Sequence, residues 1–86
     1  MSELLQVRVM VEDVWDEVAL VVPANTAIAT LKAAALEATG VHEPAGEFEA
    51  KFRGALLMDE DRSVADVGMV KGSSIILVPR RRRPVR

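Results

Sequence analysis

The sequence predicts an α+β fold in which one α-helix packs against one face of a mixed β-sheet. Three observations lead to this class. Apolar and polar residues alternate near both ends of the chain, a single central segment has helical spacing, and 86 residues allow one domain with a modest core. Hydrophobic residues make up 50% of the sequence and aromatic residues only 3%, so that core must be aliphatic.

Two strands joined by a short polar connection are predicted first. In residues 4–12 (LLQVRVMVE), every second residue from Leu5 to Val11 is apolar, which is typical of a strand with one buried face. After the polar stretch EDVWDE, residues 18–22 continue the alternation, and the two runs together predict a β-hairpin. Pro23 ends the second strand because proline has no N–H to donate.

A helix is predicted from about Thr26 to about Thr39. The side chain of Asn25 or Thr26 could accept hydrogen bonds from the free N–H groups of its first turn. Gly40 suits the left-handed residue that closes a helix. The residues that share one face at helical spacing are Ile28, Leu31, Ala35 and Leu36.

The remaining elements are short. After the loop VHEPAGE, residues 48–53 predict a third strand, Gly54 permits a tight turn, and ALLM predicts a small fourth strand. A single turn of helix is expected near Ser63–Val67, with Val64, Val67 and Met69 as apolar anchors. The final strand, SSIILVP, directs Ile75 and Leu77 to one side and Ile76 and Val78 to the other.

The connection between the first and last strands crosses the sheet, so these two strands are expected to lie parallel and adjacent at its centre.

This order of elements, together with the stretch FRGALLMDEDRSVADVGMVKGSSIILV, resembles ubiquitin. As in ubiquitin, a strand ends in glycine, a leucine precedes an acidic turn, and an Arg-Ser step, an aspartate and an apolar anchor lead to a closing strand. The resemblance covers about residues 4–80, with one extra residue in the DED turn, and implies a ubiquitin-like β-grasp of four to five strands in ββαββ order. The matching residues are Gly54, Leu57, Asp59, Arg62, Ser63, Val64, Asp66, Met69, Ser73, Ile75, Leu77 and Val78.

The resemblance also implies a structural pair. Ubiquitin buries a helix lysine near an acid in the turn after its fourth strand, and Lys32 and Asp59 stand at similar places here. A buried pair would be costly to break, about 3–5 kcal/mol when one partner is removed. The alternative is an exposed pair that contributes about 0–1 kcal/mol.

Ubiquitin-like domains are covalent modifiers, sulfur carriers or docking modules, and the first two need a C-terminal glycine. Arg82, Arg83 and Pro84 stand where the resemblance would place the end of the tail, and no glycine follows Gly72. We therefore expect a non-enzymatic, non-covalent docking module. The alternative is a covalent modifier, or its precursor, in a bacterial conjugation system. Among bacterial relatives without a terminal diglycine, the chain most resembles the YukD-like accessory family of type VII secretion.

The resemblance places a partner-binding patch on the exposed sheet face. It would contain Ile76 and Val78, with Lys51 where the family has an isoleucine and with Arg8 and Met10 beside them. The alternative is an ordinary sheet face with scattered apolar residues. Trp15, in the polar hairpin connection, could anchor an interface, but we expect it to fold back over the hairpin.

The chain divides into a domain of residues 1–79 and a basic tail of residues 80–86. Without residues 79–86, 6 basic and 13 acidic residues remain, so residues 1–78 carry a net charge of −7. The tail could bind an acidic partner or an anionic membrane through Arg80, Arg81, Arg82 and Arg83. The alternative is that these side chains remain solvated. Nucleic acid is not expected, because the sequence has no aromatic platform and no second basic cluster.

Catalytic and metal sites are not expected, and neither is a cofactor. The chain has no cysteine, and its single histidine, His42, stands alone in a loop. The cluster Asp59–Asp61 lacks the spacing of a calcium loop and predicts a solvated turn, and no base accompanies Ser63, Ser73 or Ser74. The N-terminus lacks the pattern of a signal peptide, so we expect a cytoplasmic protein.

Overall fold

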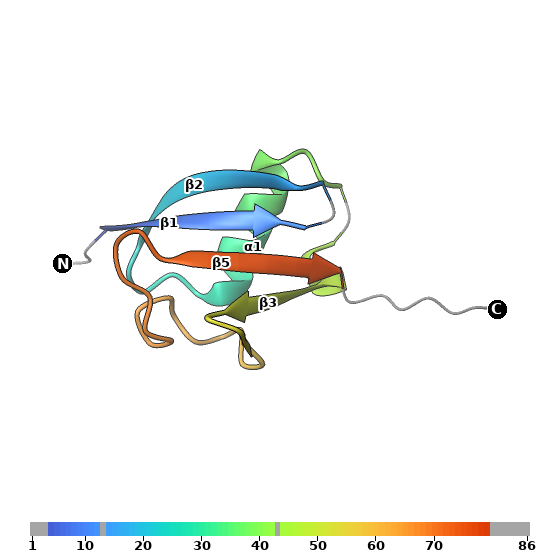
Figure 1. Cartoon of the computed structure of the whole chain (residues 1–86). Helices are drawn as coiled ribbons and strands as arrows, with labels where there is room; N and C mark the ends of the chain where they lie inside the picture. Colours follow the sequence, from blue (N-terminus) through green and yellow to red (C-terminus); the bar gives the residue numbers. More distant parts are fainter. Residues whose placement is uncertain (1–3, 13, 43, 80–86) are drawn as a thin grey trace.

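A computed structural model describes residues 4–12, 14–42 and 44–79, and in it one helix crosses one face of a twisted sheet (Figure 1). The predicted α+β class is confirmed, with five strands in a mixed sheet. The elements, in chain order, are β1 (Leu4–Val11), β2 (Asp16–Pro23), α1 (Ile28–Ala38), the 3₁₀ turn η1 (Ala45–Glu47), β3 (Phe48–Phe52), β4 (Ala55–Leu56) and β5 (Ser74–Pro79).

The strands lie in the order β2-β1-β5-β3-β4. The predicted parallel pair is confirmed, since β1 and β5 run side by side at the centre, with Val9 opposite Ile75 and Val11 opposite Leu77. All other pairs are antiparallel. A parallel pair needs a long crossover connection, which here contains β2, α1, β3 and β4. Figure 1 shows α1 and β3 on this path.

The core forms between α1 and the inner face of the sheet. The predicted alternation is confirmed on β1, where Val7, Val9 and Val11 are fully buried. The predicted apolar face of the helix is buried as well, and so are the anchors Val64 and Met69. The remaining buried apolar residues of the core are Phe48, Ala50, Phe52, Ile75 and Leu77.

The start of α1 differs from the prediction. Its N-cap is Ala27, and neither Asn25 nor Thr26 supplies a capping side chain. Backbone carbonyls of the loop before residue 63 act as acceptors in place of a capping side chain. The N–H of Ile28 donates to the Arg62 carbonyl (2.9 Å), and the N–H of Ala29 donates to the Glu60 carbonyl (3.0 Å). First-turn N–H groups need some acceptor, and sequence cannot show when a distant loop provides it.

The end of α1 follows the prediction. Gly40 is left-handed, with φ of 79°. Its N–H donates to the Glu37 carbonyl (3.2 Å) and the N–H of Val41 donates to the Leu36 carbonyl (2.9 Å), which together make a Schellman motif.

The tight turn predicted at Gly54 is also confirmed. Arg53 and Gly54 have φ of 57° and 81°, as in the two-residue type I′ turn that joins antiparallel strands. Two short elements differ from expectation: residues 64–68 form turns without a helical assignment, and η1 lies where only a loop was predicted.

Candidate docking surface

The outer face of the sheet, opposite α1, carries all five residues of the predicted patch. The central row runs across three strands, with Met10 of β1 opposite Ile76 of β5, and Ile76 opposite Lys51 of β3. One step along the sheet in one direction, Arg8 lies opposite Ser74, and one step in the other direction, Val78 lies opposite Glu49. The structure therefore brings the five residues together, and their role in binding stays a prediction.

Ile76 is the apolar centre of this face. Its side chain is 43% exposed although both flanking residues of the strand, Ile75 and Leu77, are buried. Met10 and Val78 are partly buried beside it, while Arg8 and Lys51 are exposed. Alternate side chains of β5 therefore point into the core, and the side chains between them remain accessible on the outer face.

The surface contains three residues that the sequence prediction did not include. Glu17 lies opposite Met10, Leu56 lies opposite Lys51, and Glu49 lies opposite Val78. Glu49 could have been found, since the alternation of FEAKF places it on the same side as Lys51. Glu17 and Leu56 could not, because their positions depend on the register of neighbouring strands.

Charge is unevenly distributed over the outer face. A shallow hollow near the β3–β4 turn is lined by Lys51, Arg53, Lys71, Ser73 and Ile76, among others. None of its three cations forms an ion pair with another described residue. The guanidinium of Arg53 lies 5.6 Å from the centre of the Phe52 ring. One end of the surface is therefore basic and open to acidic groups, while acids flank Met10 and Val78.

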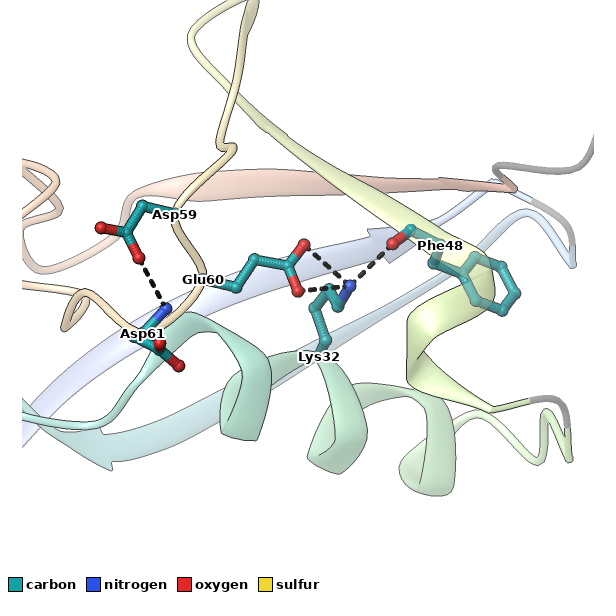
Figure 2. Close-up of polar contacts among 5 residues, drawn as sticks. All are labelled: Lys32, Phe48, Asp59, Glu60 and Asp61. Carbon is teal, nitrogen blue, oxygen red and sulfur yellow. Dashed lines mark hydrogen bonds and ion pairs between the residues drawn. The ribbon is translucent and has the colours of Figure 1, made fainter.

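Lys32 is buried and paired, but its predicted partner is wrong. Its Nζ lies 2.8 Å from both carboxylate oxygens of Glu60 and donates to the Phe48 carbonyl at 2.7 Å (Figure 2). Lys32 is 1% exposed, while the Glu60 side chain is 22% exposed. Asp59 points away from the lysine and accepts from the N–H of Asp61 (3.2 Å).

Three consecutive acids, Asp59–Asp61, stand in this turn. Only the path of the backbone decides which of these side chains points inward. The cluster is consequently not a purely solvated turn. It divides into one inward acid that neutralises Lys32 and two exposed acids, Asp59 and Asp61.

Two of the three serines considered above hold turns together. The hydroxyl of Ser63 accepts from the N–H of Asp66 (3.1 Å), and that of Ser73 accepts from the N–H of Val70 (2.9 Å). Ser74 begins β5. His42 is exposed beside the C-terminal end of α1. Within the described ranges, no three histidine, cysteine or acidic side chains are grouped as a metal site would require.

Trp15 does not fold back over the hairpin as expected. Its side chain is 74% exposed at the tip between β1 and β2, and its φ of 53° is left-handed. The neighbouring Val14 is 45% exposed. The backbone turn at this tip directs the indole outward, and a residue pattern does not encode that direction.

Solved structures show what fold this is. At a TM-score of 0.78 and 12% identity, the chain is similar to the ubiquitin of Caldiarchaeum subterraneum, with 93% of this chain and 98% of that one covered. A ubiquitin-like domain from Arabidopsis thaliana matches with a TM-score of 0.76, 15% identity and coverage of 98% and 85%. The fold is the ubiquitin-like β-grasp.

A designed protein based on ubiquitin is also similar, with a TM-score of 0.78, 16% identity and 96% of each chain covered. No family model and no curated protein matches the sequence. The β-grasp prediction is therefore confirmed at the level of fold.

The predicted tail site, Arg80–Arg83, lies outside the described residues. The last described residue, Pro79, ends β5. Of the helices in the described part of the chain, none has the length and apolar character needed to cross a bilayer.

Proposed function

We propose that this β-grasp protein is a docking module that binds another protein without forming a covalent bond. The observation that carries the proposal is the accessible side chain of Ile76 at the middle of the outer face. Ile76 lies between Met10 and Lys51, and Lys51 forms no ion pair with another described residue, so this face offers a partner both buried area and an ionic contact.

The partner that this surface fits presents an apolar side chain with carboxylates beside it. Ile76 and Met10 would receive the apolar group, and Lys51, Arg53 and Lys71 would receive the carboxylates. Charges at the rim of an interface affect the association rate and its salt dependence more than the affinity itself. We therefore expect binding to weaken as salt is raised, with a larger loss in the association rate than in the dissociation rate.

The setting that we propose is a bacterial type VII-like secretion system, where the protein would act in the cytoplasm as an accessory subunit. Support for this setting comes from the resemblance of the sequence to the YukD-like family. The surface described above is where the protein would meet the rest of such machinery.

The proposal is tested by recovering an N-terminally tagged full-length chain from its source cells, with native and denaturing washes in parallel. We expect partners that are retained in native buffer and lost in denaturant. Ile76→Asp should abolish their recovery while the domain stays folded, because the side chain is already partly exposed. Met58→Asp is the matched control, since Met58 is 81% exposed, is apolar and lies outside the strands that form the patch.

Either of two results would contradict the proposal. Partners recovered equally with wild type and Ile76→Asp would show that the outer face is not the contact. A partner that survives denaturation and is joined through the C-terminal residue would make the protein a covalent modifier.

For the tail we propose a separate electrostatic contact with an anionic membrane. The support is its sequence, with Arg80–Arg83 following a domain of opposite net charge. Binding to vesicles containing phosphatidylserine should decrease steeply with salt. Replacing the four arginines with alanine should abolish that binding, and unchanged binding would rule the contact out.

A further inference from the structure

The edge strand β2 is a second surface with no partner in the described structure. It is eight residues long, it lies at one end of the strand order, and no described strand pairs with its outer side (Figure 1). The opposite edge of the sheet is β4, which has two residues. The sheet formed by the described residues therefore has one long open edge.

Hydrogen bonds of β1 show which groups of β2 point outward. The N–H groups of Arg8 and Glu12 donate to β5 or the residue before it, so alternate residues such as Val7 and Val9 direct their N–H and C=O toward β2. Their partners there are Leu20 and Val18. The residues between them, Ala19 and Val21, must then present their N–H and C=O groups to solvent.

Along most of its length, this edge shows none of the usual protections against strand pairing among the described residues. Five consecutive residues, Val18–Val22, carry no charge, and within the strand proline is found only at the last position. Natural edge strands are normally protected by lysine, by internal proline, by a bulge or by a covering segment. Val21 is 61% exposed and Leu4, on the strand beside it, is 66% exposed, so apolar area lies along the edge.

The strand is complementary to a second copy of itself. Its acids, Asp16 and Glu17, are at one end, and its other end is apolar. If two copies pair antiparallel about Leu20, each acidic end meets an apolar end. The two Glu17 residues are then about 20 Å apart, more than twice the Debye length at physiological salt. A parallel pairing would place the acids side by side.

We propose that β2 is a self-association edge through which two copies of this chain form a continuous ten-stranded sheet. The contact is isologous, because the same strand contributes from both copies. Ala19 of one copy exchanges backbone hydrogen bonds with Val21 of the other, and Leu20 packs against Leu20. The outer-face patch around Ile76 stays open in the dimer, since β5 lies two strands away from the edge.

The test is the sedimentation of the full-length chain from micromolar to millimolar concentration. We expect a concentration-dependent change from monomer to dimer. Val21→Lys should keep the protein monomeric, because it places a charge at the centre of the contact on a side chain that is already exposed. Gln6→Lys is the matched control, since Gln6 lies opposite Val21 on the same face but one strand inward, and this variant should dimerise as the wild type does.

Amide hydrogen exchange supplies an independent readout. The N–H groups of Ala19 and Val21 should exchange rapidly in dilute protein and become protected as the dimer forms. Those of Val18 and Leu20, which face β1, should be protected at every concentration. A wild type that stays monomeric, a Val21→Lys variant that dimerises normally, or a dimer in which Ala19 and Val21 remain unprotected would each overturn the proposal.

Discussion

Removal of Glu60 should be the most destabilising single change among the charged residues around Lys32. The ammonium of Lys32 has three protons, and the structure provides three acceptors, namely the Phe48 carbonyl and the two carboxylate oxygens of Glu60. In Glu60→Ala, two of these donors lose their acceptor while the nitrogen stays on a residue that is 1% exposed. We expect a loss of about 3 kcal/mol, the lower end of the range for breaking a buried pair, because Glu60 itself is partly exposed.

The size of this effect is easily measured on a domain of this length. Its total stability should be about 4–13 kcal/mol, so 3 kcal/mol is a large fraction. The melting temperature should decrease by about 12–24 °C. Far-UV circular dichroism is the appropriate probe, because Trp15 is already 74% exposed in the folded state and its fluorescence would change little on unfolding.

A double-mutant cycle separates the pair from its surroundings. The cycle compares Lys32→Met, which removes the charge and keeps most of the length of the side chain, with Glu60→Leu and with the double variant. The double variant should recover most of the stability that Glu60→Leu alone loses, because well-packed apolar groups can replace a buried pair. Asp59→Ala is the control and should cost less than about 1 kcal/mol. If Asp59→Ala costs as much as Glu60→Ala, or if Glu60→Ala costs under about 1 kcal/mol, the reasoning is refuted.

Further changes test the turns by thermal unfolding. Gly54→Ala should cost about 1 kcal/mol because its φ of 81° is unfavourable for a residue with a Cβ, although nothing lies within 4 Å of the added atom. Gly46→Ala has the same open space without a positive φ, so it should be neutral or stabilising, and an equal loss in both would contradict the explanation. Gly40→Ala should resemble Gly54→Ala, since its left-handed conformation closes α1. Asn25→Ala should change stability by less than about 0.5 kcal/mol, and a loss of about 1 kcal/mol would show that Asn25 caps the helix after all.

Much of the candidate docking surface could be predicted from the sequence. The resemblance to ubiquitin placed Arg8, Met10, Lys51, Ile76 and Val78 in one predicted patch. Period-two alternation in the first and last strands and in FEAKF also predicts that these side chains face away from the core. These inferences succeed because a strand has a strict period, so one buried residue determines the direction of its neighbours.

Contacts between residues that are distant in the sequence could be identified only from the tertiary structure. Which acid neutralises Lys32, which carbonyls satisfy the first turn of α1 and which residues stand opposite Lys51 all depend on how separate segments meet. The same holds for the open edge of β2, since a strand becomes an edge only through the order of the sheet.

By itself, then, the sequence determined the long strands and the helix, their buried faces and the tight turn at Gly54, because these follow from local periodicity and backbone preference. Only the tertiary structure decided that Glu60 faces Lys32, that Trp15 is exposed and that β2 lies at the edge. Each of these depends on the path of the backbone through space, to which residues far apart in the chain contribute together.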